Sequence, residues 1–202
     1  MQNIVVRKGR PEDAHHFSEL VTLSSPKIFQ ILFGSKVKKI MKNLFRHRRH
    51  YYSFDRSFFA DIDGKTVGMA QLHKLRPRRR EKVNLGLLLF KYMKWSLPGS
   101  VASLLRSDKV VGDFSGRNCY LSNLAVYPEY RGLGIGTRLM DALEEEAKSI
   151  GKKELVLHAD INNKGAIKLY ERLGYRIDRK IPSLRIKNKH FEYLVIKKKI
   201  SS

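Results

Sequence analysis

The segment YRGLGIGTRL, residues 130–139, brings three glycines and two arginines together directly before a long apolar-periodic stretch. Gly132, Gly134 and Gly136 let the backbone approach a ligand without a Cβ in the way. A helix that starts here offers unpaired N–H groups and the positive end of its dipole, and Arg131 adds a full positive charge. These residue types in this order predict a site for an anion such as a pyrophosphate, held mainly by main-chain donors.

Two other glycine-rich phosphate-binding patterns match the loop less well. A Walker loop ends in Gly-Lys-Ser/Thr, whereas this loop ends in GTR. A dinucleotide-binding fingerprint reads G-x-G-x-x-G near the first strand of the chain, whereas this loop comes late and its glycines are spaced differently. The remaining alternative is an ordinary turn that is rich in glycine.

The segments that must position this loop predict a mixed α/β fold. Strand patterns lie at residues 3–9, 53–73 (a hairpin that turns at Asp63-Gly64), 118–127, 153–159, 175–181 and 190–199. Helical patterns lie at residues 10–23, after Pro26, at 135–150 and at 162–174. This order indicates a largely antiparallel central sheet with flanking helices and one parallel crossover unit in its second half.

Residues 76–116 follow this pattern less closely. They begin with the basic cluster RPRRREK, continue through an apolar stretch from Leu87 to Trp95, and break at Pro98-Gly99. We interpret them as a mainly helical, variable insertion between strands, and residues 1–202 as one domain. The apolar stretch has three interpretations: a lid, a dimer contact or ordinary core.

The chain carries a formal net charge of +22, from 41 Lys and Arg against 19 Asp and Glu. Such a surface attracts polyanions, which include nucleic acid, an anionic membrane, acidic proteins and phosphorylated small molecules, and it repels a polycationic substrate. A salty or hot habitat is a second interpretation of the same charge. Residues 36–46 form a basic amphipathic pattern, typical of a helix on a membrane or nucleic acid, or of one that simply covers the sheet.

Several features favour a cytoplasmic protein without membrane insertion. The one cysteine, Cys119, lies in an apolar run, so we expect a buried strand residue and no internal disulfide. The first residues show no signal-peptide pattern. The most apolar stretch is interrupted by Lys91 and Lys94 and is shorter than the about 20 residues that span a bilayer. No metal site is expected, because the histidines show no ligand spacing with cysteine or acid.

Two segments resemble motifs of the GNAT superfamily of N-acetyltransferases. LAVYPEYRGLGIGTRLM is similar to the family's acyl-CoA-binding motif, [R/Q]-x-x-G-x-[G/A], with Arg131, Gly134 and Gly136 in the defined positions. NNKGAIKLYERLGYR resembles the motif that follows, an Asn and an Ala before a Tyr on a helix, closed by leucine, glycine and an aromatic residue. The resemblance is specific over residues 120–176, and VRKGRPEDA and DGKTVGMAQL match the usual first half more loosely.

The resemblance implies an N-acetyltransferase that moves an acetyl group from acetyl-CoA to a primary amine by direct attack in a ternary complex. The strand with LAV would splay from the strand with ELVLHA and hold the pantetheine arm, and the Val126 amide would stabilise the thioester oxygen. Tyr170 would protonate the leaving thiolate as a general acid, with a core aromatic as the alternative; Asn163 would bond the pantetheine arm, cap the helix, or both. The implied cofactor-binding residues are Leu124, Ala125, Val126, Arg131, Gly132, Leu133, Gly134, Ile135, Gly136, Thr137, Asn163, Ala166 and Tyr170.

The general base and the acceptor have several candidates. Many relatives have a carboxylate on the strand that leads into the cofactor motif, but residues 120–123 are Tyr, Leu, Ser and Asn. The candidates by element position are Glu129, His158, Asp160 and Glu192. The acceptor is an amine of a protein or peptide, or a small amine. A different class, a nucleic-acid-associated or regulatory CoA-binding module without catalysis, would use RPRRREK, FRHRRHYY and IKKKI to contact an anionic macromolecular partner.

Overall fold

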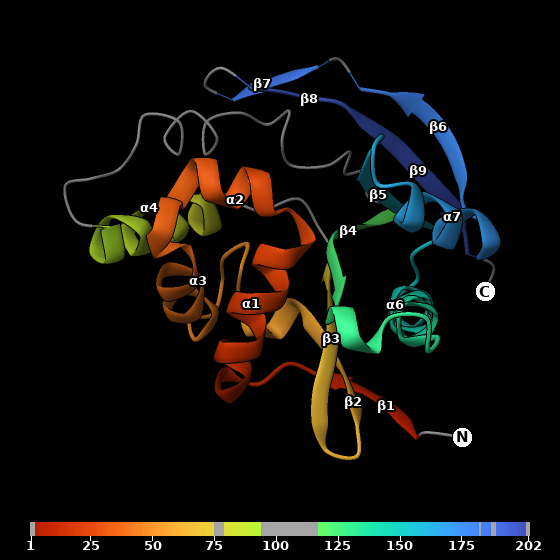
Figure 1. The fold of residues 1–202 in the computed structure, drawn as a ribbon, viewed down its shortest axis with the longest axis horizontal. Coiled ribbons are helices and arrows are strands. Elements are labelled where there is room, and N and C mark those ends of the chain that lie inside the picture. The colour runs from red at the N-terminus through yellow and green to blue at the C-terminus, as the bar shows by residue number, and fades with distance from the viewer. Residues whose placement is uncertain (1–2, 75–78, 94–116, 182, 187–188, 201–202) are drawn as a thin grey trace.

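The computed structural model describes residues 3–74, 79–93, 117–181, 183–186 and 189–200 (Figure 1). A seven-stranded sheet has the strand order β1-β2-β3-β4-β5-β9-β6, and β7 and β8 form a separate hairpin. The strands are β1 Ile4–Lys8, β2 Ser57–Ile62, β3 Lys65–His73, β4 Asn118–Val126, β5 Glu154–Asp160, β6 Arg176–Lys180, β7 Leu184–Ile186, β8 Lys189–Phe191 and β9 Tyr193–Lys199. Of these described strands only β4 and β5 pair in parallel, so the predicted mixed, largely antiparallel sheet with one parallel crossover is confirmed.

Helices lie on both sides of the sheet (Figure 1). The helices on one side are α1 Ala14–Ser24, α2 Pro26–Phe33, α3 Val37–Phe45 and α4 Arg79–Met93. On the other side are α6 Ile135–Ser149 and α7 Lys164–Arg172. The short 3-10 turns are Pro11–Asp13, Gly34–Lys36, Phe54–Arg56 and Pro128–Tyr130. Within the described residues, none of the helices combines the length and hydrophobicity that spanning a membrane requires.

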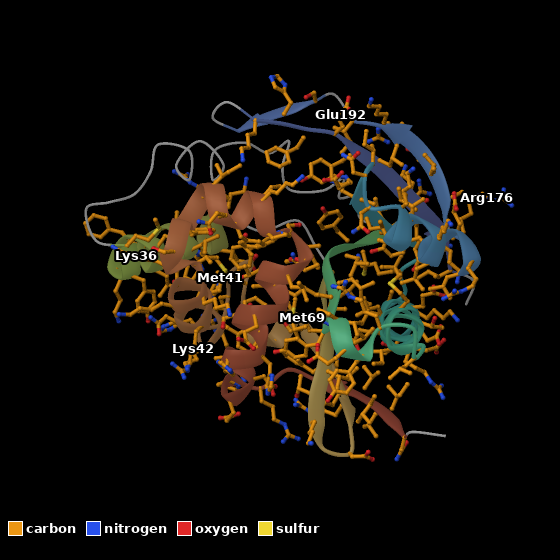
Figure 2. All side chains as sticks on the ribbon, in the orientation of Figure 1. Lys36, Met41, Lys42, Met69, Arg176 and Glu192 are labelled. Atoms are coloured by element: carbon orange, nitrogen blue, oxygen red, sulfur yellow. The ribbon has the colours of Figure 1, made fainter. Side chains whose placement is uncertain are left out.

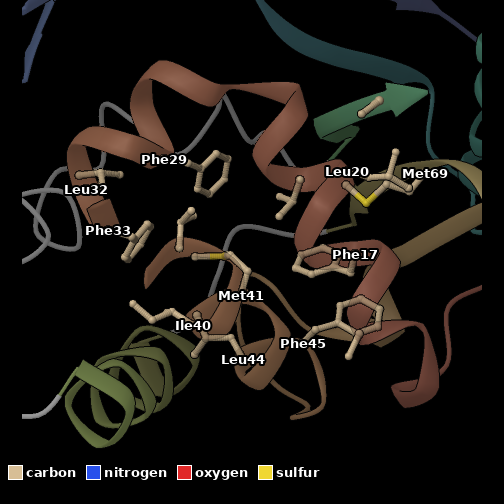
Figure 3. Packing of buried hydrophobic residues seen from close by; sticks show 14 of the residues in the cluster. Phe17, Leu20, Phe29, Leu32, Phe33, Ile40, Met41, Leu44, Phe45 and Met69 are labelled. Carbon is tan, nitrogen blue, oxygen red and sulfur yellow. The ribbon is translucent and has the colours of Figure 1, made fainter. Parts of the chain in front are cut away.

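Each side of the sheet has its own apolar cluster. The cluster under α1–α4 includes Met41 and Met69 (Figure 2) and the stacked rings of Phe17 and Phe45, whose centroids are 4.2 Å apart (Figure 3). The second cluster packs α6 and α7 against the opposite face. It contains Cys119, which is buried as predicted, and burial raises the pKa of its thiol to about 11. The central strands are therefore covered on both faces.

The structure refines three of the predicted elements. The helical region after Pro26 is divided into α2 and α3 at Gly34, whose φ of +58° a residue with a side chain rarely adopts. The strand predicted over 190–199 is divided at Glu192 into β8 and β9, because the chain first forms a hairpin with β7. In the predicted insertion, residues 79–93 are helical as expected, whereas 94–116, with Trp95 and Pro98-Gly99, lie outside the described residues.

A network of ion pairs holds the first strand to β2 and to the start of α1. Arg7 donates from Nη1 and Nη2 to the Asp13 carboxylate, both at 2.8 Å, and from Nε to Asp61 at 2.6 Å. The Arg10 N–H also donates to Asp13, at 2.7 Å. Burial alone would raise the pKa of Asp13, but the hydrogen bonds from Arg7 and Arg10 outweigh it and hold the pKa below its ordinary value. The ionised carboxylate therefore stabilises the fold.

Replacing this carboxylate with an amide in Asp13→Asn should lower the free energy of unfolding at neutral pH by about 2–3 kcal/mol, because Arg7 loses a charged partner. A depressed carboxyl pKa gives stability that is present above the unfolded pKa of about 4 and is lost as pH falls through the folded pKa. The wild-type chain should therefore lose stability below about pH 4 more steeply than the variant. Denaturant unfolding at neutral and acidic pH measures both effects.

The control for this prediction is Glu145→Gln, which removes a carboxylate from an exposed pair with Lys148. An exposed pair of this kind contributes little to stability, so the control should resemble the wild type at both pH values. Equal acid sensitivity of Asp13→Asn and the wild type would show that Asp13 is not the titrating group.

Candidate functional site

The central strands β4 and β5 run side by side at first and then diverge. Their parallel pairing begins at Asn118 and ends at Leu121, which lies beside Leu157. Beyond this point β4 stays paired with β3 as far as Val126, and β5 stays paired with β9 as far as Asp160. The edges of β4 and β5 that face each other are therefore not paired as strands after Leu121 and Leu157.

An extra residue in β4 marks the point of divergence. The register between β3 and β4 shifts between Gln71 and Leu72, which oppose Asn123 and Leu121, so Ser122 has no opposite residue in β3. A bulge of this kind bends a strand and increases its local twist. The bend therefore begins where the pairing with β5 ends.

The backbone groups of β4 alternate between the two neighbouring strands. The N–H of Tyr127 donates to Val67 in β3 at 3.0 Å. By alternation, the N–H and C=O groups of Val126 and Leu124 point the other way, toward the unpaired edge of β5. Ala125 is paired with β3 and its side chain is buried in the cluster under α1–α4. The Val126 carbonyl accepts a hydrogen bond from Arg131 Nε at 3.3 Å, so the main-chain groups of Leu124 and the N–H of Val126 are the ones offered where the strands diverge.

The glycine-rich loop leads from β4 into α6 and is exposed from Arg131 to Gly134. Gly132 and Gly134 have φ angles of +82° and +78°, the left-handed region that favours glycine. The N–H of Arg138 donates to the Gly134 carbonyl at 3.1 Å, which is the first bond of the helix. The amides of residues 135–137 therefore have no intrahelical partner, as the anion-site prediction requires.

The second predicted motif packs beside this loop. A Cβ on Gly136 would lie 3.0 Å from Leu169 Cδ2, so glycine allows α7 to approach the start of α6. Asn163 precedes α7, and its Oδ1 accepts the N–H of Ala166 at 3.2 Å. The cap that the sequence suggested for Asn163 is confirmed by this bond.

Tyr170 lies in α7 with a side chain that is 6% exposed. Its ring contacts Tyr175 with the centroids 6.0 Å apart, and Tyr175 in turn donates to Glu144 at 3.0 Å. For the Tyr170 hydroxyl the described residues show no hydrogen-bond partner, and burial raises its pKa above the ordinary value. The phenol therefore keeps its proton at neutral pH.

His158 lies in β5, immediately after the last residue that pairs with β4. Its ring meets that of Tyr120 edge-on, with the centroids 5.2 Å apart and the planes at 71°. Leu157 packs in the cluster with α6 and α7, and successive strand side chains point to opposite faces. The rings of His158 and Tyr120 are thus on the face of the sheet opposite to Tyr170.

The other candidate bases have different surroundings. Asp160 accepts a backbone N–H at 2.8 Å, and Glu192 forms an ion pair with Lys180 at 2.7 Å. Glu129 is exposed in the 3-10 turn after β4. Of the four candidates, His158 is the one that lies where β4 and β5 begin to diverge. Among the described residues, no group of three or more His, Cys, Asp or Glu side chains is placed to hold a metal ion.

A polar network at the bulge was not predicted from the sequence. His73 Nε2 lies 2.9 Å from Ser122 Oγ, Arg56 Nη1 lies 3.0 Å from His73 Nδ1, and the Tyr51 ring stacks on His73 at 4.1 Å. Burial and the charge of Arg56 lower the pKa of His73 well below its ordinary value. The neutral imidazole then accepts from Arg56 and donates to Ser122. No local pattern links these four positions, because they come from separate elements.

Curated N-acetyltransferases match parts of this chain. N-alpha-acetyltransferase 30 of Schizosaccharomyces pombe is 43% identical over 56 residues, which are 28% of this chain and 37% of that protein. Among eight curated relatives the match spans 24% to 58% of their own length, less than two thirds in each case.

Solved structures share the fold over nearly the whole chain. A crystal structure of an acetyltransferase has a TM-score of 0.71 at 21% identity and covers 98% of this chain and 100% of its own. A putative acetyltransferase from Salmonella typhimurium, solved with its cofactor acetyl-CoA, has a TM-score of 0.58 at 14% identity and covers 98% of this chain and 94% of its own. The model of the acetyltransferase (GNAT) family matches residues 26–175, most of the chain, and the chain therefore belongs to the GNAT acetyltransferase family.

Proposed function

We propose that this chain moves the acetyl group of acetyl-CoA to a primary amine by direct attack in a ternary complex. The observation that carries the proposal is the pair of diverging edges of β4 and β5 beside the unpaired amides at the start of α6. An unpaired strand edge binds an extended chain as an added strand would, and helix amides without partners bind phosphate. The names of the curated relatives, which are N-acetyltransferases, favour the same reaction.

The chain offers groups suited to each part of acetyl-CoA. In the loop from Arg131 to Thr137, the unpaired amides of residues 135–137 and the Arg131 charge would hold the pyrophosphate, whereas the Arg131 N–H itself donates to the Pro128 carbonyl at 3.2 Å. The main-chain groups of Leu124 and Val126 would pair with the pantetheine arm. The side chain of Asn163 would form a further hydrogen bond to the same arm. The Val126 N–H would then stabilise the negative charge that develops on the thioester oxygen during attack.

Tyr170 would supply the proton that the departing sulfur needs. A phenol with the ordinary pKa of about 10 is already protonated at neutral pH, and burial raises the pKa of Tyr170 further, so the hydroxyl is in the form that a general acid requires.

His158 would remove the proton from the attacking amine. An amine with a pKa near 10.4 is mostly protonated at neutral pH and must lose a proton before it attacks. A neutral imidazole accepts a proton directly or through one water molecule. His158 and Tyr170 lie on opposite faces of the sheet, so the amine and the sulfur would exchange protons on opposite sides of the diverging edges.

The acceptor we propose is a primary amine of a protein, a peptide or a small molecule. The net charge of +22 repels polycations, which favours an acceptor that is neutral or acidic overall. The name of the Schizosaccharomyces pombe relative favours an α-amine. A CoA-binding module without catalysis, the other class considered, would bind acetyl-CoA and show no turnover with any amine.

The variant Thr137→Asp separates cofactor binding from the stability of the helix. An acid in the first turn of α6 favours the helix dipole by about 0.5 kcal/mol, yet it places a negative charge where the pyrophosphate would lie. Acetyl-CoA at about 100 times its Kd should stabilise the wild-type chain by ~2.7 kcal/mol in thermal unfolding, and Thr137→Asp should lose this stabilisation. Thr137→Asn, the uncharged isostere, should keep most of it. A wild-type chain that acetyl-CoA does not stabilise would refute the proposed function.

Two neighbouring tyrosines separate catalysis from stability. Tyr170→Phe should lower kcat by roughly 10²- to 10⁴-fold, because the general acid is lost, while the stabilisation by acetyl-CoA is unchanged. Tyr175→Phe removes the 3.0 Å bond to Glu144 and should cost about 1 kcal/mol of stability with kcat retained. Steady-state kinetics and denaturant unfolding of both variants give the comparison. An unchanged kcat in Tyr170→Phe would show that Tyr170 is a core aromatic residue and not the general acid.

The pH dependence of kcat/KM identifies the base. In the wild type the acidic limb should report the protonation of His158, and in His158→Gln this limb should disappear and the rate at neutral pH should fall by roughly 10²-fold. The loss should shrink as the pH rises through the pKa of the acceptor, about 7.7–8.0 for an α-amine and about 10.4 for a lysine side chain, because the deprotonated amine no longer needs a base. Glu192→Gln is the matched control and should keep the acidic limb. Loss of the limb in Glu192→Gln instead would assign the base to Glu192.

A further inference from the structure

The outer face of α4 exposes large apolar side chains at helical spacing. Val83, Leu87 and Phe90 are 54%, 64% and 48% exposed. Their spacing of four and three residues places them on one stripe of the helix. Leu85 and Leu89, by contrast, are buried in the cluster under α1–α4, so α4 is anchored to the core by its inner side.

The segment that contains α2, α3 and the loop after α3 is strongly cationic. Between Val21 and Phe54 the chain has eight lysines and arginines and no aspartate or glutamate: Lys27, Lys36, Lys38, Lys39, Lys42, Arg46, Arg48 and Arg49. Lys38 pairs with Glu19 at 3.1 Å. For Lys39 and Lys42 of α3, and for Lys36 and Arg46 at its two ends, the described residues provide no ion-pair partner. Within the part of the chain that the structure describes, the charge of these four side chains is therefore not compensated by an ion pair.

Specific contacts hold this cationic segment against α4. Asn84 of α4 donates from Nδ2 to the carbonyls of Arg48 and Arg49, at 3.1 and 3.2 Å. His47 Nε2 lies 2.7 Å from the Tyr92 hydroxyl. Because Asn84 is one turn from Leu87, the arginines after α3 are attached beside the apolar stripe. Figure 1 shows α3 and α4 together at the end of the molecule away from α6 and α7.

From this juxtaposition we propose that the outer faces of α3 and α4, with the loop 46–49, dock peripherally on an anionic lipid surface. Val83 and Leu87 would enter the headgroup region, and the lysines and arginines around them would attract acidic headgroups. Nucleic acid matches the charge but not the exposed aliphatic side chains. A second copy of this chain matches poorly, because the same cationic face would meet itself.

Co-sedimentation of the full chain with lipid vesicles tests the proposal. The chain should bind vesicles of phosphatidylcholine mixed with phosphatidylglycerol, bind phosphatidylcholine alone weakly, and lose affinity as salt rises. Val83→Ser with Leu87→Ser should lower the partition coefficient by about tenfold or more, because the apolar area no longer leaves water. Replacing Lys39, Lys42 and Arg46 with glutamine should lower it by roughly 100-fold, at about fivefold per charge.

Matched controls lie at the opposite end of the molecule, where Figure 2 labels Arg176. Replacing Arg172, Arg176 and Lys199, all exposed, with glutamine removes the same net charge. Ile177→Ser changes an apolar side chain that is 47% exposed. Both controls should bind anionic vesicles as the wild type does, and thermal unfolding shows that every variant is folded. The acetyl-CoA-induced stabilisation should be the same in all of them, so the outcome does not depend on the proposed enzymatic function.

Three results would overturn the proposal. An equal loss of binding in the control triple would show a response to net charge alone. An unchanged partition of the Val83 and Leu87 double variant would remove the apolar contribution. Competition of vesicle binding by poly(U) RNA, together with RNA binding that requires Lys39, Lys42 and Arg46 but neither Val83 nor Leu87, would assign the face to nucleic acid.

Discussion

The divergence of the two parallel strands is the constraint on which the rest of the site depends. Each strand keeps a partner on its outer side, β3 for β4 and β9 for β5, so the inner edges separate without exposing the remainder of the sheet. The extra residue at Ser122 fixes where separation begins. Because apolar clusters cover both faces of the sheet, the main-chain groups of Leu124 and the N–H of Val126 remain for a ligand, whereas the Val126 carbonyl accepts a hydrogen bond from Arg131 Nε at 3.3 Å.

The same divergence explains how groups from distant segments share one site. The glycine-rich loop at residues 131–137 follows the end of β4, and α7 follows the end of β5. Because β4 and β5 are neighbours in the sheet, the loop and α7 come from the same edge of the sheet. Gly136 allows Leu169 of α7 to approach the start of α6, and Tyr170 packs in the same apolar cluster as Ile135. His158 lies on the opposite face of the sheet, because successive side chains of β5 point to alternate faces. Acid and base candidates are thereby separated by the sheet and need no direct contact.

Local signals predicted the parts of this arrangement that local chemistry determines. Asp63 and Gly64 adopt φ angles of +49° and +75°, as their hairpin pattern indicated, and the glycine loop precedes a helix as expected. The hairpin of β7 and β8 was missed, because its residues carry the same apolar and basic composition as the strand that follows. The contact of Tyr120 with His158 depends on the parallel register of β4 and β5, and no pattern within either segment encodes that register.

The helix that carries the exposed apolar stripe is joined to the bulge by a chain of polar contacts. Glu81 of α4 pairs with Arg56 at 2.8 Å, Arg56 donates to His73 at 3.0 Å, and His73 lies 2.9 Å from Ser122. These contacts link α4 to the residue at the bulge in β4. The glycine loop and α6 lie on the other side of the sheet (Figure 1). A molecule docked through α3 and α4 would keep its cofactor loop free to exchange acetyl-CoA with solvent.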